Sequence, residues 1–226
     1  MLTLRRGVVG VVAVLLVSGV ALAQTPADIA EWRVQANAGH EYAQYNLGVA
    51  YETGQGVPQD YAQAASWYRK AADQGLAAAQ YNLGVMYTNG QGVPQDYAQA
   101  VAWTRKAADQ GHARAQHNLG TSYANGRGVP QDFAQAVTWT RKAADQGETR
   151  SQFNLGAMYA NGQGVPKDAV LAYMWLNLAA SRASAKDRER HAETRDRVAK
   201  KMTRAQIAEA QKLAREWHAA FDTRQK

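Results

Sequence analysis

The sequence predicts an all-α solenoid, a stack of helix-turn-helix repeats that is closed at its C-terminal end by a helical cap. A Leu-Gly pair recurs at positions 47, 83, 119 and 155, with a constant spacing of 36 residues. Self-similarity at such a period is typical of solenoid proteins. Within each copy, apolar residues recur at helical spacing on both sides of a loop rich in glycine. Each copy is therefore predicted to be two helices joined by a loop.

Residues 1–23 are predicted to be an export signal. A short basic region precedes an apolar run over 7–20, and Ala21-Leu22-Ala23 has the small-x-small pattern of a cleavage site. The apolar run is shorter than the roughly 20 residues that a membrane-spanning helix needs, so a membrane anchor is the less favoured interpretation. We expect cleavage near Ala23 and a mature protein that is periplasmic or secreted.

The copy over 79–111 illustrates the first helix of a repeat. Ala79, Leu83 and Tyr87 are four residues apart and place apolar side chains on one helical face. Asn89-Gly90 is a typical helix end, because glycine accepts a left-handed conformation. Pro94 restricts the residue before it to extended conformations, so the following segment is predicted to be a loop.

The second helix is predicted to begin at an aspartate. Asp96 can cap the free amides of the helix, and Gln99 three residues later completes the pattern of a capping box. Asp60/Gln63 and Asp132/Gln135 repeat this pair, whereas Asp168 keeps only the cap. Because these aspartates recur in every copy, we interpret them as structural caps and not as catalytic carboxylates.

The repeated pattern is Ala-x-x-x-Leu-Gly-x-x-Tyr-x-x-Gly-x-Gly-Val-Pro-x-Asp-x-x-x-Ala-x-x-Trp-x-x-Lys-Ala-Ala-x-x-Gly. It resembles the Sel-one-like repeat (SLR), a relative of the tetratricopeptide repeat. The resemblance covers four copies over 43–183, preceded by a degenerate helix or partial repeat over 24–42, in which Trp32 aligns with Tyr68. It implies a right-handed α/α solenoid that serves as an adaptor or scaffold between proteins.

Residues 184–226 are predicted to form charged and capping helices. The segment 185–201 is mostly charged, and its (i, i+4) pairs Glu193/Arg197 and Asp196/Lys200 predict a solvated helix. Thr203 and Gln206 then form a capping box. An apolar stripe follows and is predicted to cover the last repeat, with a docking helix for a partner or a membrane surface as the alternative. The stripe consists of Ile207, Ala210, Leu213, Ala214, Trp217 and Phe221.

Charge is unevenly distributed along the chain. Residues 24–147 hold 9 Lys/Arg and 10 Asp/Glu. Residues 148–226 hold 15 Lys/Arg and 9 Asp/Glu, a net charge of +6. A solvated helical face is the favoured interpretation of this basic region, and contact with an anionic envelope component is the alternative. Nucleic acid is not an expected partner, because no aromatic stacking motif accompanies the basic residues.

No motif of a catalytic or cofactor site occurs. His112 and His117 are five residues apart, whereas two metal ligands on one helical face are expected four apart. Nucleophile-elbow, phosphate-loop and dinucleotide motifs are absent, so we expect no enzyme activity, metal or cofactor. A β-lactamase-like hydrolase is a disfavoured alternative: it would follow from cysteine-rich bacterial relatives, but this chain has neither a cysteine nor a Ser-x-x-Lys set.

The resemblance places the first helix of each repeat along a concave groove. By this register the groove contains an aromatic row and, one turn earlier in two repeats, an arginine. Aromatic rings flanked by arginines are suited to an extended peptide with acidic groups, which gives a partner-binding hypothesis. Packing of the row against neighbouring helices is the alternative. The predicted partner-binding residues are Tyr45, Tyr81, His117, Phe153, Arg114 and Arg150.

These observations predict a non-enzymatic adaptor of the bacterial envelope that binds a protein or peptide of unknown identity in its groove. A cell-wall or anionic-polymer binding protein, using the basic C-terminal region, is the second hypothesis. Salt separates the two, because affinity for a polyanion falls steeply as ionic strength rises.

Overall fold

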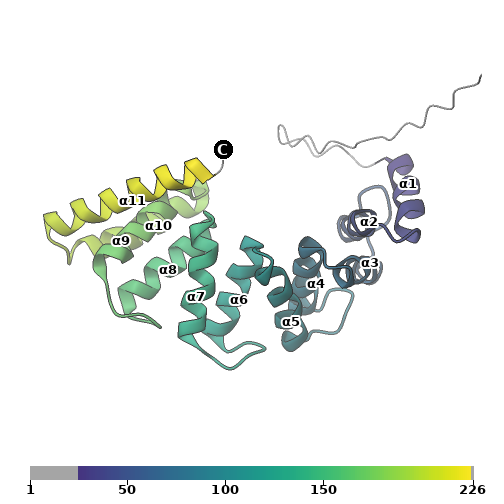
Figure 1. Cartoon of the computed structure of the whole chain (residues 1–226), viewed down its shortest axis with the longest axis horizontal. Coiled ribbons are helices and arrows are strands. Elements are labelled where there is room, and N and C mark those ends of the chain that lie inside the picture. The colour runs from purple at the N-terminus through teal and green to yellow at the C-terminus, as the bar shows by residue number, and fades with distance from the viewer. Residues whose placement is uncertain (1–24, 225–226) are drawn as a thin grey trace, which may run out of the picture.

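The predicted all-α solenoid is confirmed by a computed structural model, which describes residues 25–224; the predicted signal over 1–23 lies outside them. Within these residues the chain forms eleven helices and no strand. The helices follow one another along an arc, with α1 and α11 at its two ends (Figure 1). They are α1 (Pro26–Asn37), α2 (Glu41–Thr53), α3 (Tyr61–Asp73), α4 (Ala77–Asn89), α5 (Tyr97–Asp109), α6 (Ala113–Asn125), α7 (Phe133–Asp145), α8 (Thr149–Asn161), α9 (Ala169–Arg182), α10 (Ala185–Ala199) and α11 (Arg204–Arg224).

Four helix pairs form the repeats. The first helices are α2, α4, α6 and α8, and each packs most extensively on the second helix that follows it, which is α3, α5, α7 or α9. Helix α1 holds the place of a second helix before this array. Helix α10 begins at Ala185, 36 residues after the start of α8, and so holds the place of a further first helix. The periodic arrangement of helices therefore continues beyond the repeated sequence pattern. The domain division at 24–42, 43–183 and 184–226 stays a prediction.

The Leu-Gly pair forms the contact between the two helices of a repeat. Leu83 is fully buried, and a Cβ added to Gly84 would lie 2.5 Å from Thr104 Oγ1. In the other repeats the leucine is also fully buried, and a Cβ on the glycine would lie about as close to the second helix. Glycine is required here because the second helix approaches too closely for any side chain. Trp103 and Trp139 then fill the space around these contacts and are 6% and 7% exposed.

The predicted aspartate caps are confirmed, but the predicted Asp/Gln capping boxes of the repeats are wrong. Asp96 Oδ1 accepts hydrogen bonds from the amides of Ala98 and Gln99, at 2.9 and 3.0 Å. Gln99 does not bond back to the Asp96 amide, because that amide donates to Tyr87 O in the first helix (3.0 Å). The other cap aspartates make the same bond to Tyr51, Tyr123 and Tyr159. The Asp–Tyr bond thus closes the loop of each repeat.

The loop of each repeat also rests on the preceding repeat. Gly92 has a φ of +69°, and a Cβ at this position would lie 2.0 Å from Tyr61 O at the start of α3. Gly128 approaches Tyr97 O and Gly164 approaches Phe133 O in the same way, at 2.1 and 2.2 Å. The second glycine of the Gly-x-Gly pattern is therefore a contact between repeats.

Buried glutamines also link successive repeats. Gln80 Nε2 donates to Ala72 O of the preceding repeat (3.1 Å), and Gln80 Oε1 accepts from Gln110 Nε2 (2.8 Å). We call this series the amide ladder. It also contains the pairs Gln44–Gln74 and Gln116–Gln146, both at 2.7 Å.

The amide ladder ends in the fourth repeat. Gln152 Nε2 still donates to Ala144 O (3.2 Å). Arg182 stands where the next glutamine would follow, and Gln152 Oε1 has no partner within residues 25–224.

The prediction of a solvated helix over 185–201 is wrong in part. Helix α10 packs against α9, and His191 is only 3% exposed. The expected pairs Glu193/Arg197 and Asp196/Lys200 do not form: Arg197 donates to Thr194 Oγ1 (3.2 Å). Asp196 is instead paired with Arg195 at 2.8 Å.

The C-terminal helix closes the stack, as predicted. Its N-terminus has the expected capping box, with Thr203 N donating to Gln206 Oε1 at 2.9 Å. Helix α11 packs on α9, where the ring centroids of Trp217 and Trp175 lie 6.1 Å apart. Phe221 is 8% exposed, so the apolar stripe covers the last repeat.

Candidate peptide-binding groove

The first helices converge around a shared cavity. This cavity measures about 250 Å³ and is lined by residues of α2, α4 and α6, with part of the preceding turn. Three successive first helices border this one cavity, so these parts of the three helices lie close together. Its polar and aromatic lining comes from Tyr45, Tyr81, Asn82, His112 and Arg114.

The first half of the predicted aromatic row borders this cavity. Tyr45 is half-buried, and its ring centroid lies 5.7 Å from that of Tyr68. Tyr81 is also half-buried and stacks on His112, the N-cap of α6, with 4.8 Å between ring centroids. Each ring therefore contacts a neighbouring aromatic ring and also borders the cavity. Burial raises the pKa of Tyr45.

The second half of the row is packed against other elements. Phe153 stacks on His191 of α10, at a centroid distance of 4.4 Å, and the Arg190 guanidinium lies 5.3 Å from the same ring. His117 Nδ1 lies 2.8 Å from Ser151 Oγ in the next repeat. The structure thus brings Tyr45 and Tyr81 together in one cavity, whereas His117 and Phe153 lie further along the stack.

His117 does not form a catalytic relay with its neighbours. Its Nδ1 lies near both Ser151 Oγ and Glu148 Oε2, which is 3.7 Å away. In a relay the histidine is the base, and the nucleophile and the orienting carboxylate bond to different ring nitrogens. In addition, Ser151 is fully buried. Burial lowers the pKa of His117, opposed by the charge of Glu148.

The two predicted arginines are exposed. Arg114 borders the shared cavity, and its charge helps burial to lower the pKa of His112. Arg150 is near enough to His117 to lower the pKa of that histidine. The arginines are in successive first helices, so they can supply two cationic positions along one face of the stack.

A partly buried hydrogen bond between Tyr68 and Glu52 was not predicted. The Tyr68 hydroxyl donates to Glu52 Oε2 at 2.5 Å, and burial is the main cause that raises the pKa of Tyr68. The side chain of Asn82 acts against burial and lowers the pKa of both Tyr68 and Tyr45. The signal in the sequence was a departure from the repeat, since the position of Glu52 is Thr88 in the next copy and alanine in the later ones.

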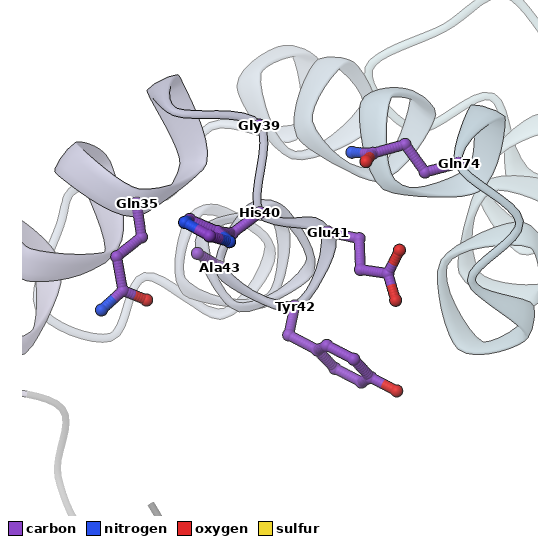
Figure 2. A pocket seen from close by; sticks show the side chains of 7 residues that line it. All are labelled: Gln35, Gly39, His40, Glu41, Tyr42, Ala43 and Gln74. Atoms are coloured by element: carbon purple, nitrogen blue, oxygen red, sulfur yellow. The ribbon is translucent and has the colours of Figure 1, made fainter. Parts of the chain in front are cut away.

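A second cavity lies at the N-terminal end of the array. It measures about 560 Å³ and borders the turn between α1 and α2 and the end of α3. Figure 2 shows the side chains of Gln35, Glu41 and Gln74 around it, with Tyr42 pointing outward. Tyr42 is 66% exposed and occupies the position that Arg114 and Arg150 hold in later repeats.

Two observations on residues 25–224 bear on the class of site. No group of three or more His, Cys, Asp or Glu side chains in this part of the chain is placed to hold a metal ion. None of the helices described is both long and apolar enough to cross a membrane.

The comparisons with known proteins agree on the type of repeat. The chain matches the Sel1 repeat at residues 41–76, 77–112, 113–148 and 149–184. No curated protein matches it. A protective antigen of uropathogenic Escherichia coli with an SLR fold is 36% identical, with a TM-score of 0.78 over 88% of this chain. A Sel1 repeat protein of Oxalobacter formigenes is 34% identical, with a TM-score of 0.67 over 70% of this chain. The matched regions are 43% and 62% of those two proteins. This chain therefore belongs to the Sel1 repeat family.

Proposed function

We propose that this protein is a non-enzymatic adaptor of the bacterial envelope, which binds a peptide or protein partner along its first helices. Proteins built from Sel1 repeats generally mediate protein–protein interaction, and the repeats make up most of this chain. The envelope location rests on the export signal in the sequence.

The observation that carries the proposal is the cavity shared by α2, α4 and α6. It combines the rings of Tyr45 and Tyr81 with the exposed side chain of Arg114. Aromatic rings give apolar contact area, and a guanidinium can bind a carboxylate with two hydrogen bonds. An extended segment with an acidic residue would find both kinds of contact there. The absence of cysteine and of a Ser-x-x-Lys set makes β-lactam hydrolysis the less supported alternative.

Site-specific crosslinking in living cells tests the proposal. A photo-reactive residue at position 114 would stand at the rim of the cavity without removing a buried side chain. A matched control at position 102 is exposed on α5, a second helix. We expect position 114, and not position 102, to capture a discrete envelope protein that mass spectrometry can identify.

Two results would count against the adaptor. Equal products from positions 114 and 102 would show that capture does not depend on the cavity. Recovery of glycan without protein from position 114 would favour the cell-wall or anionic-polymer hypothesis. With the photo-reactive residue moved to position 78, which also lines the cavity and leaves Arg114 in place, Arg114→Ala should reduce capture of the partner. The melting temperature should stay nearly unchanged, because the arginine is exposed.

A further inference from the structure

A large cavity lies between α8 and α10, and we call it the C-terminal cleft. It measures about 740 Å³, which is within the range of ligand-binding pockets. Its apolar lining includes Phe153 and Val198, and its rim includes Lys167, Arg197 and Lys201. None of the predicted groove residues except Phe153 borders it.

The C-terminal cleft is the periodic counterpart of a much smaller cavity. Between α4 and α6, two repeats earlier, a cavity of about 150 Å³ is lined by Thr88, Tyr97, Ser122 and Asn125, among others. The residues 72 positions later, Ala160, Ala169, Thr194 and Arg197, all line the C-terminal cleft. The two cavities therefore occupy the same place in the solenoid and differ by their side chains.

The substitutions between the two cavities explain the difference in volume. Tyr97 is replaced by Ala169, which removes a whole aromatic ring at the start of the second helix, and Thr88 is replaced by Ala160. In the two other repeats the position of Ala169 is also aromatic, Tyr61 or Phe133. The fourth repeat alone leaves this space open.

The same comparison shows that positive charge has been added to the rim. Arg197 takes the place of Asn125, and Lys167 takes the place of a glutamine that caps helix carbonyls in earlier repeats, such as Gln95 to Thr88 O. Arg197 is held by Thr194 Oγ1, another lining residue. Lys167, Arg197 and Lys201 are exposed and form no ion pair within residues 25–224.

The lining contains one carboxylate, and its hydrogen bonding is internal. Asp168 caps α9, where its Oδ1 accepts from Leu171 N at 2.9 Å. The cations on the rim are therefore available for carboxylates of another molecule.

We propose that the C-terminal cleft binds a protein segment in which an aromatic side chain is flanked by acidic residues. The open space left by Ala169 would take the aromatic ring, against Phe153 and Val198. The flanking carboxylates would reach Arg197 and the two lysines. The inference deepens the proposed function, on which it rests for a protein partner, but it names a second site away from Arg114.

Fluorescence anisotropy with short labelled peptides tests the inference on the purified protein. The probe is Glu-Asp-Phe-Asp-Glu, compared with Glu-Asp-Ser-Asp-Glu and Lys-Ser-Phe-Ser-Lys. We expect the first peptide to bind and the other two to bind at least about tenfold more weakly, because each lacks one of the two kinds of contact.

Variants that restore the sequence of the other repeats locate the binding. Ala169→Tyr refills the cavity, and Arg197→Asn removes the added charge; both introduce residues that already fold at the equivalent positions. Each should weaken binding of the first peptide about tenfold. Arg215→Gln, at an exposed position on α11 outside the lining, removes the same charge and should change nothing.

Three results would overturn the inference: no binding of the first peptide at millimolar concentration, unchanged binding by Ala169→Tyr, or equal losses from Arg197→Asn and Arg215→Gln. The last result would indicate diffuse attraction of the basic region for any polyanion. Arg114→Ala should leave peptide binding unchanged. Failure of the peptides alongside specific crosslinking at position 114 would remove this inference and leave the proposed function standing.

Discussion

Replacing Gly92 by alanine should weaken the contact between successive repeats far more than the same change at Gly90. Both glycines have a φ of +69°, so an alanine at either position adopts a left-handed conformation. That conformation costs an L-residue about 1–2 kcal/mol. The two positions differ in their surroundings. The new Cβ at position 90 would lie 3.3 Å from Gln95 Cβ, whereas the one at position 92 would lie 2.0 Å from Tyr61 O.

The second contact is about 1.4 Å closer than the start of ordinary van der Waals distances. Tyr61 O belongs to the backbone of α3, so the overlap cannot be relieved by a side-chain rotation. The loop must move away from the preceding repeat, and overpacking of this kind costs about 1–3 kcal/mol. We therefore expect Gly90→Ala to lower the free energy of unfolding by about 1–2 kcal/mol and Gly92→Ala by about 2–5 kcal/mol.

Urea unfolding followed by circular dichroism measures both values. The pair Gly126→Ala and Gly128→Ala repeats the test one repeat later, where the corresponding contacts are 3.3 Å to Gln131 Cβ and 2.1 Å to Tyr97 O. Equal stability of the two variants within each pair would refute the assignment of the second glycine as a contact between repeats.

Three further predictions concern the caps and the histidines. Asp96→Ala should cost about 0.5–2 kcal/mol in urea unfolding, because two amides of α5 lose their acceptor; an unchanged midpoint would contradict the capping role. Burial lowers the pKa of His112 and His117 below the usual 6.5, so both stay neutral in the folded protein where the unfolded chain is protonated. The stability that these neutral histidines allow above pH 6.5 is therefore lost as pH falls through their lower pKa values in the folded protein. Thermal melts of a His112→Leu/His117→Phe variant should depend less on pH than those of the parent. Phe221→Ala should cost about 3–5 kcal/mol by removal of a buried ring over the last repeat, and a smaller loss than an exposed control such as Gln211→Ala would refute the end-cap assignment.

The repeat pattern was sufficient to predict the helix pairs, because each structural role recurs at the same position in every copy. Leucine, glycine, aspartate and tryptophan could be assigned by comparing copies, and their contacts are the ones expected. The Asp/Gln capping boxes failed for a reason outside the local sequence: the Asp96 amide is taken by Tyr87 O across the loop. The sequence around one helix start does not show that a carbonyl of another helix accepts the same amide.

The C-terminal region was harder to predict because charged residues obscure its buried face. Helix α10 keeps the 36-residue spacing of the first helices, but only His191 on it is fully buried. Without that register, Arg197 could not be aligned with Asn125, and the C-terminal cleft was not visible. At the candidate groove, the sequence placed Tyr81 and Arg114 on the right helices. It did not show that Tyr81 stacks on His112.

The break in the amide ladder has a consequence for how the molecule opens. Up to Gln152, each repeat shares buried hydrogen bonds with its neighbour, so the α1–α8 array should exchange its amide hydrogens as one cooperative unit. Beyond Gln152 these shared bonds stop, and Arg182 instead lies over Phe221, 4.6 Å from the ring centroid. On this edge the α9–α11 segment is then joined to the array by apolar and cation–π contacts and by one hydrogen bond, from Arg224 to Asp145 O (3.4 Å). Deuterium uptake at low denaturant should therefore separate the two regions, with the C-terminal segment exchanging first.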